Sequence, residues 1–178
     1  MRVLGIDPGT AVTGYGVVQR EGLGLVLTEC GVIRTKAREP LASRLEEIYD
    51  GVRELIARHK PDAVAVEDVF YAKNVRTTVV LGHARGVILL AAQQAGLPLF
   101  EMPPAVIKKA VTGTGNATKE QVQFMVAKLL RLKRAPEPTD ASDGVAAALA
   151  CCMAPALPSL ADALAALPRA RAVRTVDP

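Results

Sequence analysis

The stretch Arg2-Val-Leu-Gly-Ile-Asp-Pro-Gly-Thr10 is an apolar run that ends on a single carboxylate and a Pro-Gly turn. It predicts a buried strand over Arg2–Ile6, with Asp7 at its end. A carboxylate leaving a core strand is costly to bury unless a cation meets it, and no lysine or arginine follows before Arg20. We therefore expect Asp7 to meet a divalent metal, a metal-bound phosphate or a lysine from elsewhere in the fold.

The order of the elements along the chain predicts an α/β fold. Short connections between the first three strands favour antiparallel pairing, and helical crossovers between the later strands favour parallel return. We expect a mixed five-stranded sheet, three antiparallel strands and then two parallel ones, with helices on both faces. The expected strands are Arg2–Ile6, Gly14–Gln19, Leu25–Ile33, Ala63–Glu67 and Leu99–Met102, and the expected helices are Leu41–Lys60, Arg76–Ala95, a short one after Pro104, Lys119–Leu132 and Thr139–Met153.

Four carboxylates are predicted to meet at one edge of this sheet. Asp7 and Glu67 each end an apolar strand, and parallel neighbours would present both at the carboxyl edge, where open α/β sheets bind ligands. Asp140 and Asp143 share one face of the first turn of the last helix. Such an acid pair is also favoured by the helix dipole alone, so only the combined order of acids indicates two Mg²⁺ ions acting on a phosphodiester. Asp68 is expected to point to the opposite face of the sheet.

Basic and aromatic residues near these acids are candidates for nucleic-acid contact. Lys108, Lys109 and Lys119 flank the glycine-rich loop 113–118, whose backbone N–H groups and following helix start can bind phosphates. The alternative is that these lysines only solvate helix ends. After Glu67, the aromatic residues of a short loop could stack on bases or anchor the loop by packing; the candidates in and after this loop are Phe70, Tyr71, Lys73, Asn74 and Arg76.

Length and composition favour one soluble globular domain. The 178 residues carry a formal net charge of +4, which is compatible with a polyanionic partner. Three cysteines make no disulfide framework, and two distant histidines make a zinc site improbable; His59 is expected at the surface. Without a signal peptide or an uninterrupted apolar run of about 18 residues, a cytoplasmic location is expected. Residues 1–154 are predicted to form the domain and 155–178 a mobile tail.

Seven stretches of this sequence together resemble the bacterial RuvC Holliday-junction resolvases, which have a ribonuclease H-like nuclease fold. They are Gly5-Ile-Asp-Pro-Gly9, Thr13–Gly16, Ile33–Lys36, Glu67–Asn74, Gly82–Gly86, Gly113–Lys119 and Asp140-Ala-Ser-Asp143. The resemblance implies Asp7, Glu67, Asp140 and Asp143 as metal ligands, Lys119 as the catalytic-site lysine and Phe70 as a wedge at the crossover. One departure is Gly144, where the family usually has alanine; a glycine costs a helix about 1 kcal/mol and is expected to loosen it.

The same resemblance implies a biological setting. It implies a homodimer that cuts four-way DNA junctions by symmetric paired nicks with 5′-phosphates, in recombination and repair. It also implies two Mg²⁺ ions per subunit, with Mn²⁺ as a substitute, and the partners RuvA and RuvB.

Three alternatives stay open on the residues alone. An ATPase or sugar kinase of the actin type shares the Asp-x-Gly-Thr opening, but it needs a second phosphate loop and a second domain, which 178 residues hardly allow. A junction-binding module with an inactive site should lack one of the acids, and all four are present. A ribonuclease H-like nuclease acting on RNA–DNA hybrids or other branched DNA would carry the same acids.

Overall fold

The computed structural model describes residues 1–68 and 75–154 and contains the expected mixed sheet. Its strands are β1 (Arg2–Asp7), β2 (Val12–Glu21), β3 (Gly24–Arg34), β4 (Ala63–Glu67) and β5 (Leu99–Met102), in the spatial order β3-β2-β1-β4-β5. The pairs β1–β2 and β2–β3 are antiparallel, whereas β1–β4 and β4–β5 are parallel. The carboxyl ends of β1, β4 and β5 therefore lie at one edge.

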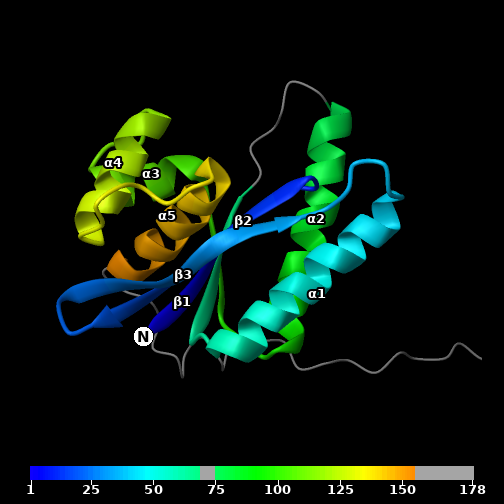
Figure 1. Cartoon of the computed structure of the whole chain (residues 1–178), viewed down its shortest axis with the longest axis horizontal. Coiled ribbons are helices and arrows are strands. Elements are labelled where there is room, and N and C mark those ends of the chain that lie inside the picture. Colours follow the sequence, from blue (N-terminus) through cyan, green and yellow to red (C-terminus); the bar gives the residue numbers. More distant parts are fainter. Residues whose placement is uncertain (69–74, 155–178) are drawn as a thin grey trace, which may run out of the picture.

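The helices cover both faces of this sheet, as predicted (Figure 1). One face carries α1 (Leu41–His59) and α2 (Val75–Gln94), and the other carries α3 (Pro104–Thr112), α4 (Lys119–Leu129) and α5 (Thr139–Met153). A capping box formed by Thr118 and Gln121 fixes the start of α4. This helix ends at Leu129 rather than Leu132.

Helix α5 packs on the sheet at very short range because both surfaces are made of small residues. Apart from Asp143, every residue from Ala141 to Cys152 is buried. A Cβ atom added to Gly5 of β1 would lie 2.2 Å from the carbonyl oxygen of Gly144, and one added to Gly144 would lie 2.6 Å from the Cα atom of Tyr15. Gly144 therefore lets α5 approach β2 closely. The expected cost of this glycine to the helix itself stays a prediction.

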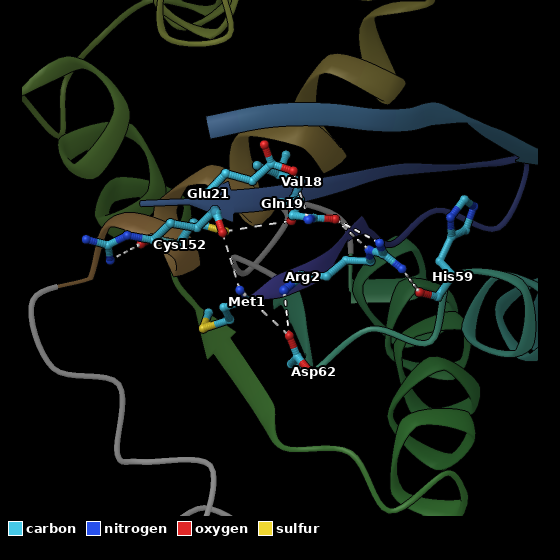
Figure 2. A network of polar contacts seen from close by, with 9 residues as sticks. Met1, Arg2, Val18, Gln19, Glu21, His59, Asp62 and Cys152 are labelled. Carbon is cyan, nitrogen blue, oxygen red and sulfur yellow. Dashed lines mark hydrogen bonds and ion pairs between the residues drawn. The ribbon is translucent and has the colours of Figure 1, made fainter. Parts of the chain in front are cut away.

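The end of β1 opposite Asp7 is fixed by a polar network (Figure 2). The Arg2 guanidinium donates to the carbonyl oxygen of His59 at 2.6 Å and to the side-chain oxygen of Gln19 at 2.8 and 3.1 Å. The backbone N–H of Arg2 donates to the carboxylate of Asp62 at 2.7 Å. The network ties β1 to β2 and to the connection between α1 and β4.

His59 is buried, which corrects the expectation of a surface residue. Its Nε2 atom lies 2.9 Å from a carboxylate oxygen of Glu29 on β3, and the other oxygen accepts hydrogen bonds from Tyr15 and Arg58, both at 2.8 Å. Burial raises the pKa of Glu29, but the Tyr15 hydrogen bond and the charges of Arg58 and His59 outweigh it and lower that pKa below its usual value. The cluster joins the last turn of α1 to the sheet.

Replacing Glu29 by alanine is expected to lower the free energy of unfolding by about 2 kcal/mol, because Tyr15 and His59 lose their charged partner. Urea denaturation at neutral pH measures this difference. The matched control is Glu54→Ala on α1, whose more exposed carboxylate lies 3.6 Å from the same Arg58. Equal midpoints for Glu29→Ala and the wild type would show that the cluster contributes nothing to stability.

Helix α2 keeps an uncovered apolar face. Among the described residues it is the one helix long and apolar enough to cross a membrane by length and composition. Only 22% of its most apolar 18-residue segment is buried. Five exposed apolar residues follow one another at helical spacings of three or four: Val75, Val79, Gly82, Gly86 and Leu90. We call this set the α2 stripe. Such a stripe is typical of a helix that packs against another protein surface, so α2 alone is weak evidence for a membrane.

Candidate active site

A cleft of about 330 Å³ opens at the carboxyl edge of the parallel strands, between the sheet and the helices of the α5 face. Three of the four predicted acids, Asp7, Glu67 and Asp143, line it together with Lys119. The remaining lining residues are Pro104, Ile107, Lys108, Val122 and Ala146. Acids that are 60 to 136 positions apart in the sequence are thus brought to one cavity.

Strand alternation explains why Asp7 and Glu67 face this cleft. On β4, Ala65 packs into the core under α5, whereas Val64 and Val66 pack into the core under α1 and α2. Glu67 continues the series of Ala65 and so lies on the α5 face. The same alternation on β1, with Val3 under α5 and Leu4 and Ile6 under α1 and α2, places Asp7 on the α5 face.

The buried carboxylates disfavour one another's charge. Burial first, and then the charges of Asp143 and Asp140, raise the pKa of Asp7 to about 7. Burial and the charges of Asp7 and Asp143 raise the pKa of Glu67 to about 8. The two side chains are also joined by a hydrogen bond, which lowers the pKa of Asp7 and raises that of Glu67.

Lys119 is the positively charged residue that forms an ion pair with one of these acids. Its Nζ atom lies 2.7 Å from a carboxylate oxygen of Asp143. Partial burial lowers the pKa of Lys119, but the hydrogen bond and charge of Asp143, with the charges of Asp140 and Asp7, outweigh it and hold this pKa above its usual value. Lys119 is the first residue of α4, so the capping box that fixes the helix start also fixes the lysine.

The other predicted site residues lie in several different places. Asp140 does not line the cleft, but its charge acts on Asp7, Lys119 and Asp143. Lys108 lines the cleft, whereas Lys109 lines an apolar hollow between α3 and the end of α5. Arg76 lies in the exposed first turn of α2. Phe70, Tyr71, Lys73 and Asn74 lie outside the described residues, as does the predicted tail 155–178.

Hard oxygen donors dominate this cleft, which suits Mg²⁺ better than a softer metal. Within residues 1–68 and 75–154, no group of three or more His, Cys, Asp or Glu side chains is spaced to hold a metal ion as it stands. In this arrangement Asp7 and Glu67 share a hydrogen bond, and Lys119 forms an ion pair with Asp143.

One charged residue beside the cleft was not assigned a role from the sequence. Arg85 of α2 contacts Asp68, the neighbour of Glu67, from the opposite face of the sheet. Arg85 lies in the stretch Gly82–Gly86, but its contact with Asp68 depends on how α2 packs across the ends of β4 and β5.

Comparison with known proteins agrees with this geometry. The sequence model of the family described as "Crossover junction endodeoxyribonuclease RuvC" matches residues 3–152. A protein of that name from Pelotomaculum thermopropionicum is 49% identical over 149 residues, 84% of this chain and 91% of the relative. One from Halorhodospira halophila is 51% identical over 148 residues, 83% of this chain and 87% of the relative.

A solved structure, titled "T. thermophilus RuvC in complex with Holliday junction substrate", superposes with a TM-score of 0.82 at 38% identity, over 86% of this chain and 93% of that one. The sheet order, the placement of the helices and the acid-lined cleft thus occur on a chain with strong sequence similarity to these nucleases. From its sequence and its ribonuclease H-like fold, the chain belongs to the RuvC family of crossover junction endodeoxyribonucleases.

Proposed function

We propose that this chain resolves four-way DNA junctions by Mg²⁺-dependent hydrolysis, one strand per subunit, with symmetric nicks that leave 5′-phosphates. The observation that carries the proposal is the cleft in which Asp7, Glu67 and Asp143 meet Lys119. Membership of the RuvC family favours this activity over an ATPase or sugar kinase. The presence of all four acids favours an active nuclease over a binding module.

The four acids would hold two metal ions, with Mn²⁺ able to substitute for Mg²⁺. Asp7 and Glu67 supply oxygens from the ends of β1 and β4, and Asp140 and Asp143 supply them from the first turn of α5. When bound, such ions activate a water molecule and stabilise the leaving oxygen of a phosphodiester. Bound cations would relieve the cost of charging these acids, because burial and, after it, the repulsion between the carboxylates raise the pKa values of Asp7 and Glu67.

Lys119 stabilises the negative charge that develops on the scissile phosphate. Its Nζ atom lies 2.7 Å from a carboxylate oxygen of Asp143, and a cation bound by Asp143 would leave this ammonium available to a phosphate oxygen. Lys108, on the wall of the same cleft, adds a second positive charge. Both lysines act in binding as well, since contacts to phosphate position the DNA.

Other DNA contacts follow from the loop after β4. We assign Phe70, with Tyr71 as the alternative, to stacking at the crossover, and Lys73, Asn74 and Arg76 to the backbone beside it. Lys109, exposed beside the hollow between α3 and the end of α5, would contact phosphate farther from the cut. Two bound Mg²⁺ ions make a protein of formal charge +4 still more positive, so junction affinity should fall with salt.

We also propose a homodimer that acts in the cytoplasm together with RuvA and RuvB in recombination and DNA repair. The α2 stripe supports the dimer. It has three exposed apolar side chains, and an added Cβ atom on its two glycines would meet nothing within 4 Å. Glycines at such positions allow a second helix to approach closely.

Replacing Val79 by aspartate is expected to convert the dimer to a monomer, raising the dimer dissociation constant about 100-fold or more. The symmetric interface would bring the same carboxylate from each copy into apolar contact. Val79 is 53% exposed in the single chain. Sedimentation velocity measures the change, with Leu23→Asp in the turn between β2 and β3 as the control. A dimer that survives Val79→Asp would place the interface elsewhere.

Mg²⁺ binding is expected to release protons and to strengthen as the pH rises from about 6 to about 9. The pKa values of Asp7 and Glu67 are raised to about 7 and about 8, so at low pH a cation must displace a proton. Calorimetric titration in two buffers of different protonation enthalpy counts the protons released. A binding constant for Mg²⁺ that does not change across this pH range would contradict the raised pKa values of Asp7 and Glu67.

The deciding experiment is nicking of a synthetic mobile four-way junction in Mg²⁺, beside a linear duplex and an RNA–DNA hybrid. Paired symmetric nicks in the junction alone are expected. Cleavage of the hybrid would agree with a nuclease site formed by the acids but would contradict the four-way junction as the substrate. Binding without cleavage in either Mg²⁺ or Mn²⁺ would overturn the nuclease activity and leave a junction-binding module.

A further inference from the structure

Six acids gather at the carboxyl edge of the parallel strands, and the sheet divides them between its faces. Asp7, Glu67, Asp140 and Asp143 belong to the α5 face. Asp68 and Glu101 belong to the α2 face, because side chains two residues apart in a strand lie on the same face. Asp68 comes two residues after Val66 of β4, and Glu101 comes two residues after Leu99 of β5. Val66 and Leu99 both pack under α1 and α2. Glu67 and Asp68 are consecutive, so the direction of one fixes the direction of the other.

Arg85 holds both acids of the α2 face. Its Nη2 atom lies 3.1 Å from a carboxylate oxygen of Asp68 and also contacts a carboxylate oxygen of Glu101. Residues on either side along α2, Ala84 and Ile88, are fully buried in the core. The guanidinium is therefore attached to a well-packed helix and is not a mobile surface group.

The backbone continues in strand geometry through this contact. The N–H of Asp68 donates to the carbonyl oxygen of Met102 at 2.9 Å, which extends the pairing of β4 with β5 one residue beyond Glu67. The side-chain contact from Arg85 and this backbone bond hold Asp68 from two directions. Together they set where β4 ends, and with it the direction of Glu67.

We propose that Arg85 is a positioning residue for the metal site: by tethering Asp68 on the α2 face, it aims Glu67 into the cleft on the α5 face. Arg85 itself touches neither the cleft nor the DNA in this role. A slip of one residue at the end of β4 would exchange Glu67 for Asp68, and the tether opposes that slip. The inference rests on the proposed metal site.

The test measures Mn²⁺ affinity of the DNA-free protein by electron paramagnetic resonance, together with the Mg²⁺ concentration for half-maximal junction cleavage. Arg85→Gln and Asp68→Ala are each expected to weaken Mn²⁺ binding and to raise that concentration about tenfold. The double variant should be no weaker than either single one, because both remove the same tether. Junction affinity without metal should stay within about threefold of wild type, since a positioning residue contacts no DNA.

Matched variants separate the possible outcomes. Arg53→Gln on α1, whose guanidinium lies over the Tyr49 ring, is the control for loss of one positive charge. Should Arg85→Gln not fold, Asp68→Ala carries the test, because its side chain is 46% exposed and its loss opens no cavity. Wild-type Mn²⁺ affinity in folded Arg85→Gln and Asp68→Ala overturns the inference. Tighter Mn²⁺ binding in Arg85→Gln also overturns it, because Asp68 would then be a metal ligand that the contact with Arg85 keeps from binding.

The same measurement on Asp7→Asn distinguishes this inference from the proposed function. If Asp7→Asn weakens Mn²⁺ binding while the Arg85 and Asp68 variants do not, only the tether is wrong. If Asp7→Asn also binds Mn²⁺ like the wild type, the metal site itself is wrong.

Discussion

Asp7→Asn is expected to reduce the rate of junction cleavage by about 10³-fold or more, because it removes a carboxylate of the proposed metal site. Asp7 is hydrogen-bonded to Glu67, and the charges of Asp140 and Asp143 act on its carboxylate. Replacing Asp7 therefore changes the surroundings of all three acids. Junction binding should survive, since the substitution removes no positive charge. Single-turnover cleavage and a metal-free binding titration measure the two quantities separately.

Stability provides a second readout for the same variant. The pKa of Asp7 is raised in the folded protein, from 3.8 to about 7. Its contribution to stability is therefore complete below pH of about 4 and is lost as the pH rises through about 7. Without metal, wild-type protein should lose stability over this window and Asp7→Asn should lose less. Asp50→Asn, on the outer surface of α1, is the control, and cleavage that persists in Asp7→Asn would refute the assignment of Asp7.

Gly14→Ala is expected to lower the free energy of unfolding by about 3 kcal/mol and to cost most of the cleavage activity. A Cβ atom at this position of β2 would lie 1.8 Å from the carbonyl oxygen of Asp140, a backbone atom that no side-chain rotation can move. The first turn of α5 would have to shift away from the sheet, and Asp140 and Asp143 would shift with it. Chemical denaturation and cleavage below the unfolding transition measure the two effects.

The matched control is Gly24→Ala, at the start of β3. Its added Cβ atom would lie 3.4 Å from the nearest atom, the carbonyl oxygen of Glu21, which is an ordinary contact distance. Wild-type stability is expected there. A Gly14→Ala protein as stable and active as the control would mean that α5 does not approach β2 as closely as the structure shows.

Local sequence pattern was sufficient for the strands, most helix positions and the acids of the cleft. Val64 to Val66 form an apolar run that ends on Glu67, and this pattern identified both the strand and the acid. The order of elements then determined which strands pair in parallel. Helix ends were less predictable. The expected helix 119–132 continues the apolar spacing to Leu132, but α4 ends at Leu129.

Contacts between distant elements could not be predicted from local pattern. His59 has the sequence context of a surface residue at a helix end, and its burial depends on Glu29 of an edge strand 30 residues earlier. Lys108 and Lys109 are adjacent, yet one lines the cleft and the other a separate hollow, because successive residues of α3 face different neighbours. Arg85 meets Asp68 only once α2 is laid across the sheet.

The tight seat of α5 also limits how this protein could be made more heat-resistant. Filling a cavity is a common way to stabilise a core, but Gly5, Gly14, Gly16 and Gly144, at the contact between α5 and the sheet, leave no space for a methyl group. Thermostabilising changes would have to be sought on outer helices. One such place is the start of α1, where Pro40 provides no side-chain cap and the first turn has no acidic residue.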